Sequence, residues 1–184
     1  MFIDSKNILL DSDPILREKA ISVSLPLSFE DKEILQAMLE YVRNSQDEQF
    51  CEKYNVRPSV GIAAPQIGVS KKMIAISIRN EDDQALEYAL ANPKIITNST
   101  KKTYLENGES CLSVATDVEG VVLRHNRITV KAYNLLTDQV EEIKLKGYPA
   151  IVMQHEIDHL KGVLYYDHID SVNPWYKPEN AISI

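Results

Sequence analysis

The chain has 184 residues, 44% of them hydrophobic and 26% charged, with a formal net charge of −7 at pH 7. This composition is ordinary for a soluble globular protein, and the length suits one domain over 1–184 with an ample hydrophobic core. The acidic balance argues against direct nucleic-acid binding, and no apolar run is long enough to cross a bilayer. Because no signal-peptide pattern follows Met1, we expect a cytoplasmic protein without membrane contact.

The N-terminal part of the chain has the patterns of capped helices. An acid and a proline begin a short helix predicted over 13–17. Ser28 opens a capping-box-like pattern, after which apolar residues recur at helical spacing, so we predict a second helix over 28–42 that packs on the core. Cys51, beside Phe50, is predicted to be a small buried hydrophobe rather than half of a disulfide.

After Met73 the hydrophobic pattern becomes typical of β-strands. Strands are predicted over 73–78, 87–91, 94–97, 121–124, 128–134 and 140–145. Thr137-Asp138 marks a turn, so the last two strands are expected to form a hairpin. No long helical pattern separates the strands, which favours antiparallel pairing.

The segment that follows the strands predicts a helix over about 149–161. Pro149 suits its first turn, and Gly162 suits a left-handed residue just after its end. We therefore expect an α+β fold, with helices near the N-terminus and small, mostly antiparallel β-sheets around a buried helix that carries His155-Glu156-Ile157-Asp158-His159.

This helix carries the most informative motif of the chain. His155 and His159 are four residues apart, so both imidazoles lie on one helix face and can reach one metal ion. Glu156 can then take a proton from a water molecule at that ion. The neighbouring Ile151 and Val152 are apolar, and buried imidazole and carboxylate groups need partners, which a metal supplies.

A catalytic zinc-like site needs a third protein ligand. The residues leave four candidates open, namely His125, His168, Glu179 and Cys111. Cys111 lies in a polar, turn-like segment where a bare thiol would be exposed, and metal ligation explains it better than packing.

A third segment, 61–68, combines small residues with two glycines. Its glycines allow close approach to the backbone, and Gln66 offers an uncharged donor that suits an oxyanion. The alternative is that the segment only makes a tight connection between a helical region and a strand.

Together the three segments resemble the motifs of the peptide deformylase family, G-x-G-[hydrophobic]-A-A-x-Q, E-G-C-[hydrophobic]-S and H-E-x-x-H. They occur in that order as 59–66, 109–113 and 155–159. The resemblance extends to 13–17 and 145–152, and the insertion at 44–47 resembles the longer subclass common in Gram-positive bacteria.

The resemblance implies a metalloenzyme of protein biosynthesis, a hydrolase that removes the formyl group from the N-terminal N-formylmethionine of nascent polypeptides. It implies one Fe²⁺ per chain, with Zn²⁺, Ni²⁺ or Co²⁺ as substitutes. Cys111, His155 and His159 would be the ligands and Glu156 the general base and later acid. Gln66 and the backbone N–H of Leu112 would hold the formyl oxygen.

The expected partners are therefore N-formylmethionyl peptides. Ile151 and Val152 are candidates to line the pocket for the methionine side chain, and Gly61 and Ile62 are candidates to pair with the substrate backbone. We expect a monomer, and the resemblance also implies transient ribosome contact.

Two motif glycines are replaced in this chain. Ser59 stands for the first glycine of the first motif, and Ser110 stands for the glycine before the cysteine. If position 110 requires a positive φ, serine costs on the order of 1 kcal/mol there. These changes motivate an alternative, a divergent low-activity or non-catalytic binder of metal or formyl-peptides. A zincin-type endopeptidase with a downstream His or Glu ligand is a further alternative.

Overall fold

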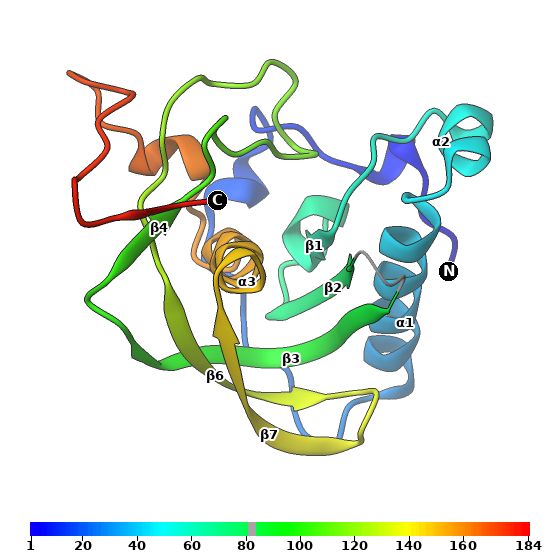
Figure 1. The fold of residues 1–184 in the computed structure, drawn as a ribbon. Helices are drawn as coiled ribbons and strands as arrows, with labels where there is room; N and C mark the ends of the chain where they lie inside the picture. The colour runs from blue at the N-terminus through cyan, green and yellow to red at the C-terminus, as the bar shows by residue number, and fades with distance from the viewer. Residues whose placement is uncertain (81–83) are drawn as a thin grey trace.

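The structure is a computed structural model that describes residues 1–80 and 84–184. It has the predicted α+β architecture, with a five-stranded antiparallel sheet curving around the helix α3 (Figure 1). The strand order is β1-β2-β3-β6-β7. The bounds are β1 Gly61–Ala63, β2 Met73–Arg79, β3 Ala85–Asn98, β6 Arg127–Asn134 and β7 Gln139–Lys146.

The remaining elements surround this sheet. The α-helices are α1 Phe29–Asn44, α2 Glu48–Tyr54 and α3 Tyr148–His159, and the 3₁₀ helices are Ser5–Asn7, Pro14–Arg17, Ala64–Ile67 and Tyr165–His168. A small second sheet pairs β4 Lys102–Tyr104 antiparallel with β5 Arg124–His125 and parallel with β8 Ile182–Ser183. Within the described ranges, no helix has both the length and the apolar character needed to span a membrane.

The two N-terminal helices form where the capping signals predict them. Ser28 caps α1 by accepting a hydrogen bond from the Asp31 backbone N–H (3.1 Å), and the helix continues two residues beyond the predicted 28–42. The predicted helix over 13–17 is a single 3₁₀ turn capped by Asp13. The apolar stripe of α1 is buried against the sheet, as expected.

Two strand predictions need correction. The segments 87–91 and 94–97 belong to one strand, β3, whose register shifts around Asn92 (φ 53°), where asparagine tolerates the left-handed backbone. Of 121–124, Arg124 alone is in a strand. Val121 instead donates its N–H to the Pro174 carbonyl oxygen (2.7 Å), and Val122 is buried in a separate cluster. The predicted β6–β7 hairpin is confirmed.

The helix α3 carries the HEIDH motif and is buried, as predicted. It begins at Tyr148 with Pro149 in its first turn, and Gly162 follows its end with a φ of 73°. Ala150, Met153 and Ile157 pack on the face of the sheet opposite α1. This burial fixes the motif helix against the sheet.

Replacing Gly162 with alanine is expected to destabilise the fold more than the same change at Gly68. Both glycines have positive φ, which costs alanine on the order of 1 kcal/mol. At Gly162 a Cβ would also lie 2.4 Å from the carbonyl oxygen of Arg17, so backbone has to move, whereas at Gly68 the nearest atom is 3.7 Å away. Urea unfolding of both variants measures the difference, and equal losses would contradict this account.

Candidate active site

The two motif histidines and Cys111 come together at one point. The ligand atoms of Cys111, His155 and His159 all lie within 4.8 Å of one another. Sγ of Cys111 is 3.3 Å from Nε2 of His159, and both side chains are buried. One thiol and two imidazoles are a donor set suited to a borderline divalent ion with a fourth position left open. The cluster therefore fits a metal ion of this kind.

The other three candidates for the third ligand lie elsewhere. Nδ1 of His125 contacts the Ser99 carbonyl oxygen (2.6 Å), Nε2 of His168 contacts Asp158 (2.8 Å), and Glu179 is exposed near the C-terminus. Of the four, Cys111 alone joins the histidine pair.

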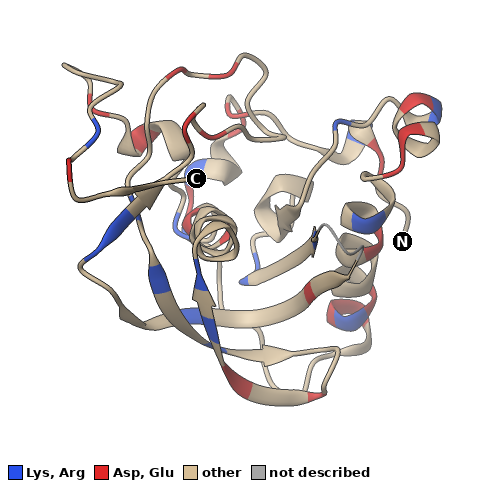
Figure 2. Ribbon diagram, viewed as in Figure 1, with Lys and Arg blue, Asp and Glu red and all other residues tan. Residues whose placement is uncertain are grey.

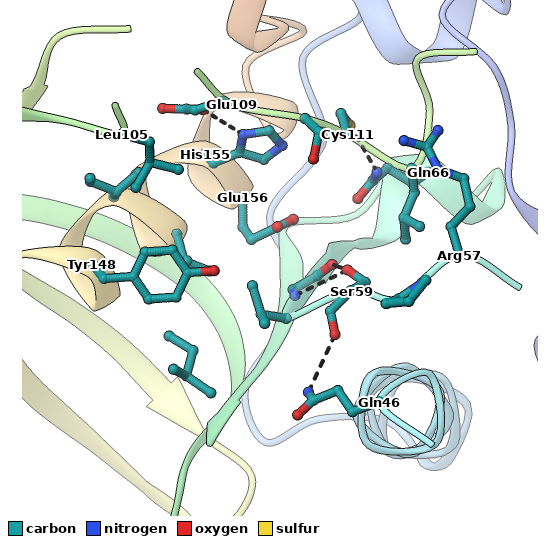
Figure 3. Close-up of a pocket in the computed structure, with 18 of the residues that line it drawn as sticks. Gln46, Arg57, Ser59, Gln66, Leu105, Glu109, Cys111, Tyr148, His155 and Glu156 are labelled. Carbon is teal, nitrogen blue, oxygen red and sulfur yellow. Dashed lines mark hydrogen bonds and ion pairs between the residues drawn. The ribbon is translucent and has the colours of Figure 1, made fainter. Parts of the chain in front are cut away.

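A buried carboxylate, Glu109, orients His155. Oε2 of Glu109 is 2.8 Å from Nδ1 of His155, which leaves Nε2 of the ring for the cluster (Figure 3). Arg124 donates two hydrogen bonds to Glu109 (2.8 and 2.9 Å) and also pairs with Asp158 on α3. Burial alone would raise the pKa of Glu109, but hydrogen bonds from Arg124 and His155 lower it to about 2.

This Glu109–Arg124–Asp158 network was missed by the sequence analysis. A signal for it exists, because Arg124 is the single charged residue that ends an otherwise apolar run, 121–123. A buried guanidinium requires carboxylate partners, since an unpaired buried charge is very unfavourable. The run was instead interpreted as a strand.

Glu156 projects into the same space from α3 (Figure 3). It is buried, and its Oε2 has no hydrogen-bond partner within the described residues. Burial raises the pKa of Glu156 to about 7. A Cβ at Gly61 would lie 2.5 Å from Oε1 of Glu156, so the glycine is what leaves room for this carboxylate. A free carboxylate oxygen with a pKa near neutrality suits the transfer of protons.

Gln66 is positioned by the 3₁₀ helix that follows β1. Its Oε1 accepts a hydrogen bond from the Ala63 N–H (2.8 Å), which fixes the amide, and its Nε2 donates to Ser113 Oγ (3.1 Å) and to Cys111 Sγ (3.5 Å). Leu112, next to Cys111, lines the same pocket.

The N-terminal segment ties these two motif segments together. The N–H of Leu9 donates to the Gln66 carbonyl oxygen (2.8 Å), and the N–H of Asp11 donates to the Ser113 carbonyl oxygen (2.7 Å). Residues 9–11 therefore bridge the first and second motifs through backbone hydrogen bonds.

A pocket of about 470 Å³ opens in front of the cluster. Its lining joins the chemical groups to apolar side chains and includes Val60, Gly61, Gln66, Ile78, Leu105, Cys111, Leu112, Tyr148, Ile151, Val152, His155 and Glu156. Ile62 is not part of the lining, because its side chain is fully buried in the core on the α1 side of the sheet. The predicted contact involves the backbone of Ile62 and not its side chain, and it stays a prediction.

The two serines that replace motif glycines do so without backbone strain. Neither Ser59 nor Ser110 has a positive φ, and in the turn before Cys111 the positive φ (82°) falls on Gly108. Ser110 is exposed at the pocket, one residue from the cysteine of the cluster. The steric cost considered for serine at position 110 does not arise.

Comparison with known proteins agrees with this site. Residues 5–175 match the family model described as polypeptide deformylase. Peptide deformylase 2 of Bacillus cereus is 53% identical over 176 residues, covering 96% of this chain and 95% of that protein. Peptide deformylase 2 of Bacillus subtilis is 50% identical over 182 residues, covering 99% and 98%.

Solved structures give the same result. The crystal structure of a peptide deformylase from Synechococcus elongatus in complex with actinonin has a TM-score of 0.72 at 29% identity and covers 89% of this chain and 80% of that chain. The Thermotoga maritima peptide deformylase has a TM-score of 0.69 at 32% identity, with coverages of 89% and 96%. The predicted resemblance is thus confirmed over nearly the whole length, and the chain belongs to the peptide deformylase family, metal-dependent hydrolases that remove the N-formyl group from nascent polypeptides.

Proposed function

We propose that residues 1–184 form one catalytic domain in which Cys111, His155 and His159 hold a single Fe²⁺ ion. The observation that carries this proposal is the convergence of one thiol and two imidazoles within 4.8 Å. A thiolate gives a metal more electron density than a third histidine would, which favours iron, with Zn²⁺, Ni²⁺ or Co²⁺ as substitutes. When bound, the metal would lower the pKa of a water molecule and polarise the formyl oxygen.

In the proposed reaction Glu156 moves the proton. It accepts the proton of the attacking water and passes it to the nitrogen of the leaving amine, which completes the hydrolysis of the formamide. The unpaired Oε2 and the pKa of about 7 support both roles, because a group with that pKa exchanges protons readily near neutral pH.

Gln66 and Leu112 are proposed to stabilise the oxygen of the formyl group. Negative charge develops on this oxygen in the transition state, and fixed N–H donors lower its energy without reorganising. The hydrogen bond from the Ala63 N–H holds the Gln66 amide, so that Nε2 points toward Cys111. The backbone N–H of Leu112 would be the second donor.

The substrate is proposed to lie between the apolar wall and β1. The methionine side chain would rest against Ile151 and Val152, which line the pocket, and the peptide backbone would run beside Gly61. The side chain of Ile62 points into the core, so Ile62 is proposed to face the substrate through its backbone alone.

We further propose that the protein acts in the cytoplasm as a monomer that contacts the ribosome transiently. Although the net charge is negative, several basic residues lie on β6 and β7, beside acidic residues at the start of β7 (Figure 2). The exposed basic residues are Arg127, Lys131, Lys144 and Lys146. Arg127 lies directly opposite Lys146, and Lys131 lies opposite Glu142. Like charges in the Arg127–Lys146 arrangement destabilise a sheet, which supports contact with a negatively charged surface of the ribosome.

An assay of the iron-loaded protein tests the central proposal. The assay measures the increase in free amine over time with formyl-Met-Ala-Ser and with unformylated Met-Ala-Ser. An increase is expected with the formylated peptide alone. Glu156→Gln is expected to retain the metal but to lose at least about 100-fold in kcat, because the proton acceptor is removed. Cleavage inside either peptide would instead indicate an endopeptidase, and one bound metal without turnover would indicate a non-catalytic relative.

Metal affinity tests the role assigned to Glu109. Glu109→Gln is expected to weaken metal binding about 10- to 100-fold, because the neutral amide no longer holds His155 as a carboxylate does. Glu106→Gln is the matched control, since this exposed acid pairs with Lys177 on the surface. Chelator competition measures both affinities, and similar values for the two variants would remove Glu109 from the metal centre.

Ribosome co-sedimentation tests the basic face. Lys144→Glu with Lys146→Glu is expected to weaken an association that also weakens steeply between about 50 and 200 mM salt. Lys19→Glu with Lys53→Glu makes the same charge change at exposed positions outside β6 and β7. Equal loss in both double variants would show that net charge, rather than this face, governs binding.

A further inference from the structure

The outer edge of β1 presents one residue to the pocket. β1 is the terminal strand of the five-stranded sheet, and within residues 1–80 and 84–184 its strand partner is β2 alone. Ser77 donates its N–H to the Val60 carbonyl oxygen (3.0 Å), and Gly61 is the next residue, opposite Ile76. Antiparallel pairs alternate between hydrogen-bonded and non-hydrogen-bonded positions, so the N–H and C=O of Gly61 point away from β2. An extended peptide along this edge would pair with them.

In this protein the Ser59 hydroxyl already forms hydrogen bonds with both the N–H and the C=O of Gly61. Its Oγ donates to the Gly61 carbonyl oxygen at 2.6 Å and accepts from the Gly61 N–H at 3.3 Å (Figure 3). The family motif has glycine at position 59, which has no side chain to make these contacts. The contacts are therefore a consequence of the departure from the motif.

Ser59 is held in this position by the end of α1 and the residues after it. Its N–H donates to Ser45 Oγ (3.2 Å), and its carbonyl oxygen accepts from Ser45 Oγ (3.2 Å) and from Gln46 Nε2 (3.3 Å). Ser45 is itself fully buried. The backbone of Ser59 is thus fixed, so that its short side chain remains within reach of Gly61.

We propose that Ser59 is a specificity-determining residue, an internal competitor that a peptide substrate must displace from the edge of β1. The inference deepens the proposed function and rests on the proposed course of the substrate beside Gly61. When the substrate binds, its backbone forms hydrogen bonds with Gly61 in place of those from Ser59. The Ser59 hydroxyl then has to form a hydrogen bond with another group, such as water. Substrates with a peptide backbone beyond methionine therefore bind less tightly than they would beside glycine.

The Glu156 carboxylate lies on a different side of Gly61 from Ser59. A Cβ at Gly61 would point at the Glu156 carboxylate, 2.5 Å from Oε1, whereas Ser59 contacts the backbone groups of the glycine. Removing the hydroxyl therefore changes how the peptide is bound and leaves the proton transfer as it is. Removal of the Ser59 hydroxyl is therefore expected to change KM and to leave kcat unchanged.

Steady-state kinetics of Ser59→Ala and Ser59→Gly test this proposal. For formyl-Met-Ala-Ser, KM is expected to fall about two- to ten-fold, the range of one net hydrogen bond, with kcat unchanged. For formyl-methionine, which has no further residues, KM is expected to stay the same. Ser59→Thr keeps the hydroxyl and is expected to keep the KM of the unmodified protein.

Ser99→Ala is the matched control. Ser99 Oγ donates to the Lys101 carbonyl oxygen two residues ahead (2.9 Å), the same kind of contact, outside the active-site pocket. The proposal is overturned if KM for the tripeptide is unchanged in Ser59→Ala and Ser59→Gly, or if it falls equally for formyl-methionine.

Binding of unformylated Met-Ala-Ser, measured by calorimetry on the metal-loaded protein, does not require turnover. Ser59→Ala is expected to tighten this binding by the same two- to ten-fold factor. Tighter binding without any turnover would refute the proposed reaction and retain the role of Ser59. Turnover together with unchanged peptide affinity in Ser59→Ala would support the proposed reaction and refute the role of Ser59.

Discussion

A buried guanidinium between two buried carboxylates holds the active site together. Arg124 lies on β5, Glu109 lies on the loop that leads to Cys111, and Asp158 lies on α3 between the two histidines. Removing one partner of such a buried pair typically costs about 3–5 kcal/mol, because an uncompensated charge remains. The loop that carries Cys111 and the helix α3 therefore cannot separate without leaving a buried charge unpaired or exposed to water. This arrangement ties the segment that carries Cys111 to the helix that carries His155 and His159.

A second constraint is the close approach of β1 to α3. Because Gly61 has no side chain, the Glu156 carboxylate can lie directly against the edge strand. The proposed base, Glu156, and the backbone groups proposed to align a peptide thus belong to one small region, and both lie on regular elements, α3 and β1. Catalysis of this kind relies on holding reacting groups in place, and a packed helix against a sheet achieves this better than loops do.

The sequence predicted those features whose signals are local. The Ser28 cap, the β6–β7 hairpin and α3 with Gly162 follow from short-range patterns, and three ordered motifs brought Cys111 and Gln66 to the histidine pair. The misassignment of 121–124 arose because an apolar run predicts burial without saying which element it forms. The Glu109–Arg124 pair depends on how two separate segments lie in the fold, and hydrophobic periodicity does not encode this. The Ser59–Gly61 contact depends on the direction in which the backbone groups of Gly61 point, which periodicity does not encode either.

The bridge formed by residues 9–11 bears on how this chain folds during its own synthesis. These residues are made early, but their backbone partners, the carbonyl oxygens of Gln66 and Ser113, are made more than fifty and about one hundred residues later. Contacts between residues so far apart in sequence form late, since the intervening chain has to be ordered first. The N-terminal segment therefore has to wait, unpaired, and it closes the two motif segments together only after most of the chain has been made. Residues made among the first can therefore take their native places only after Ser113 has been made.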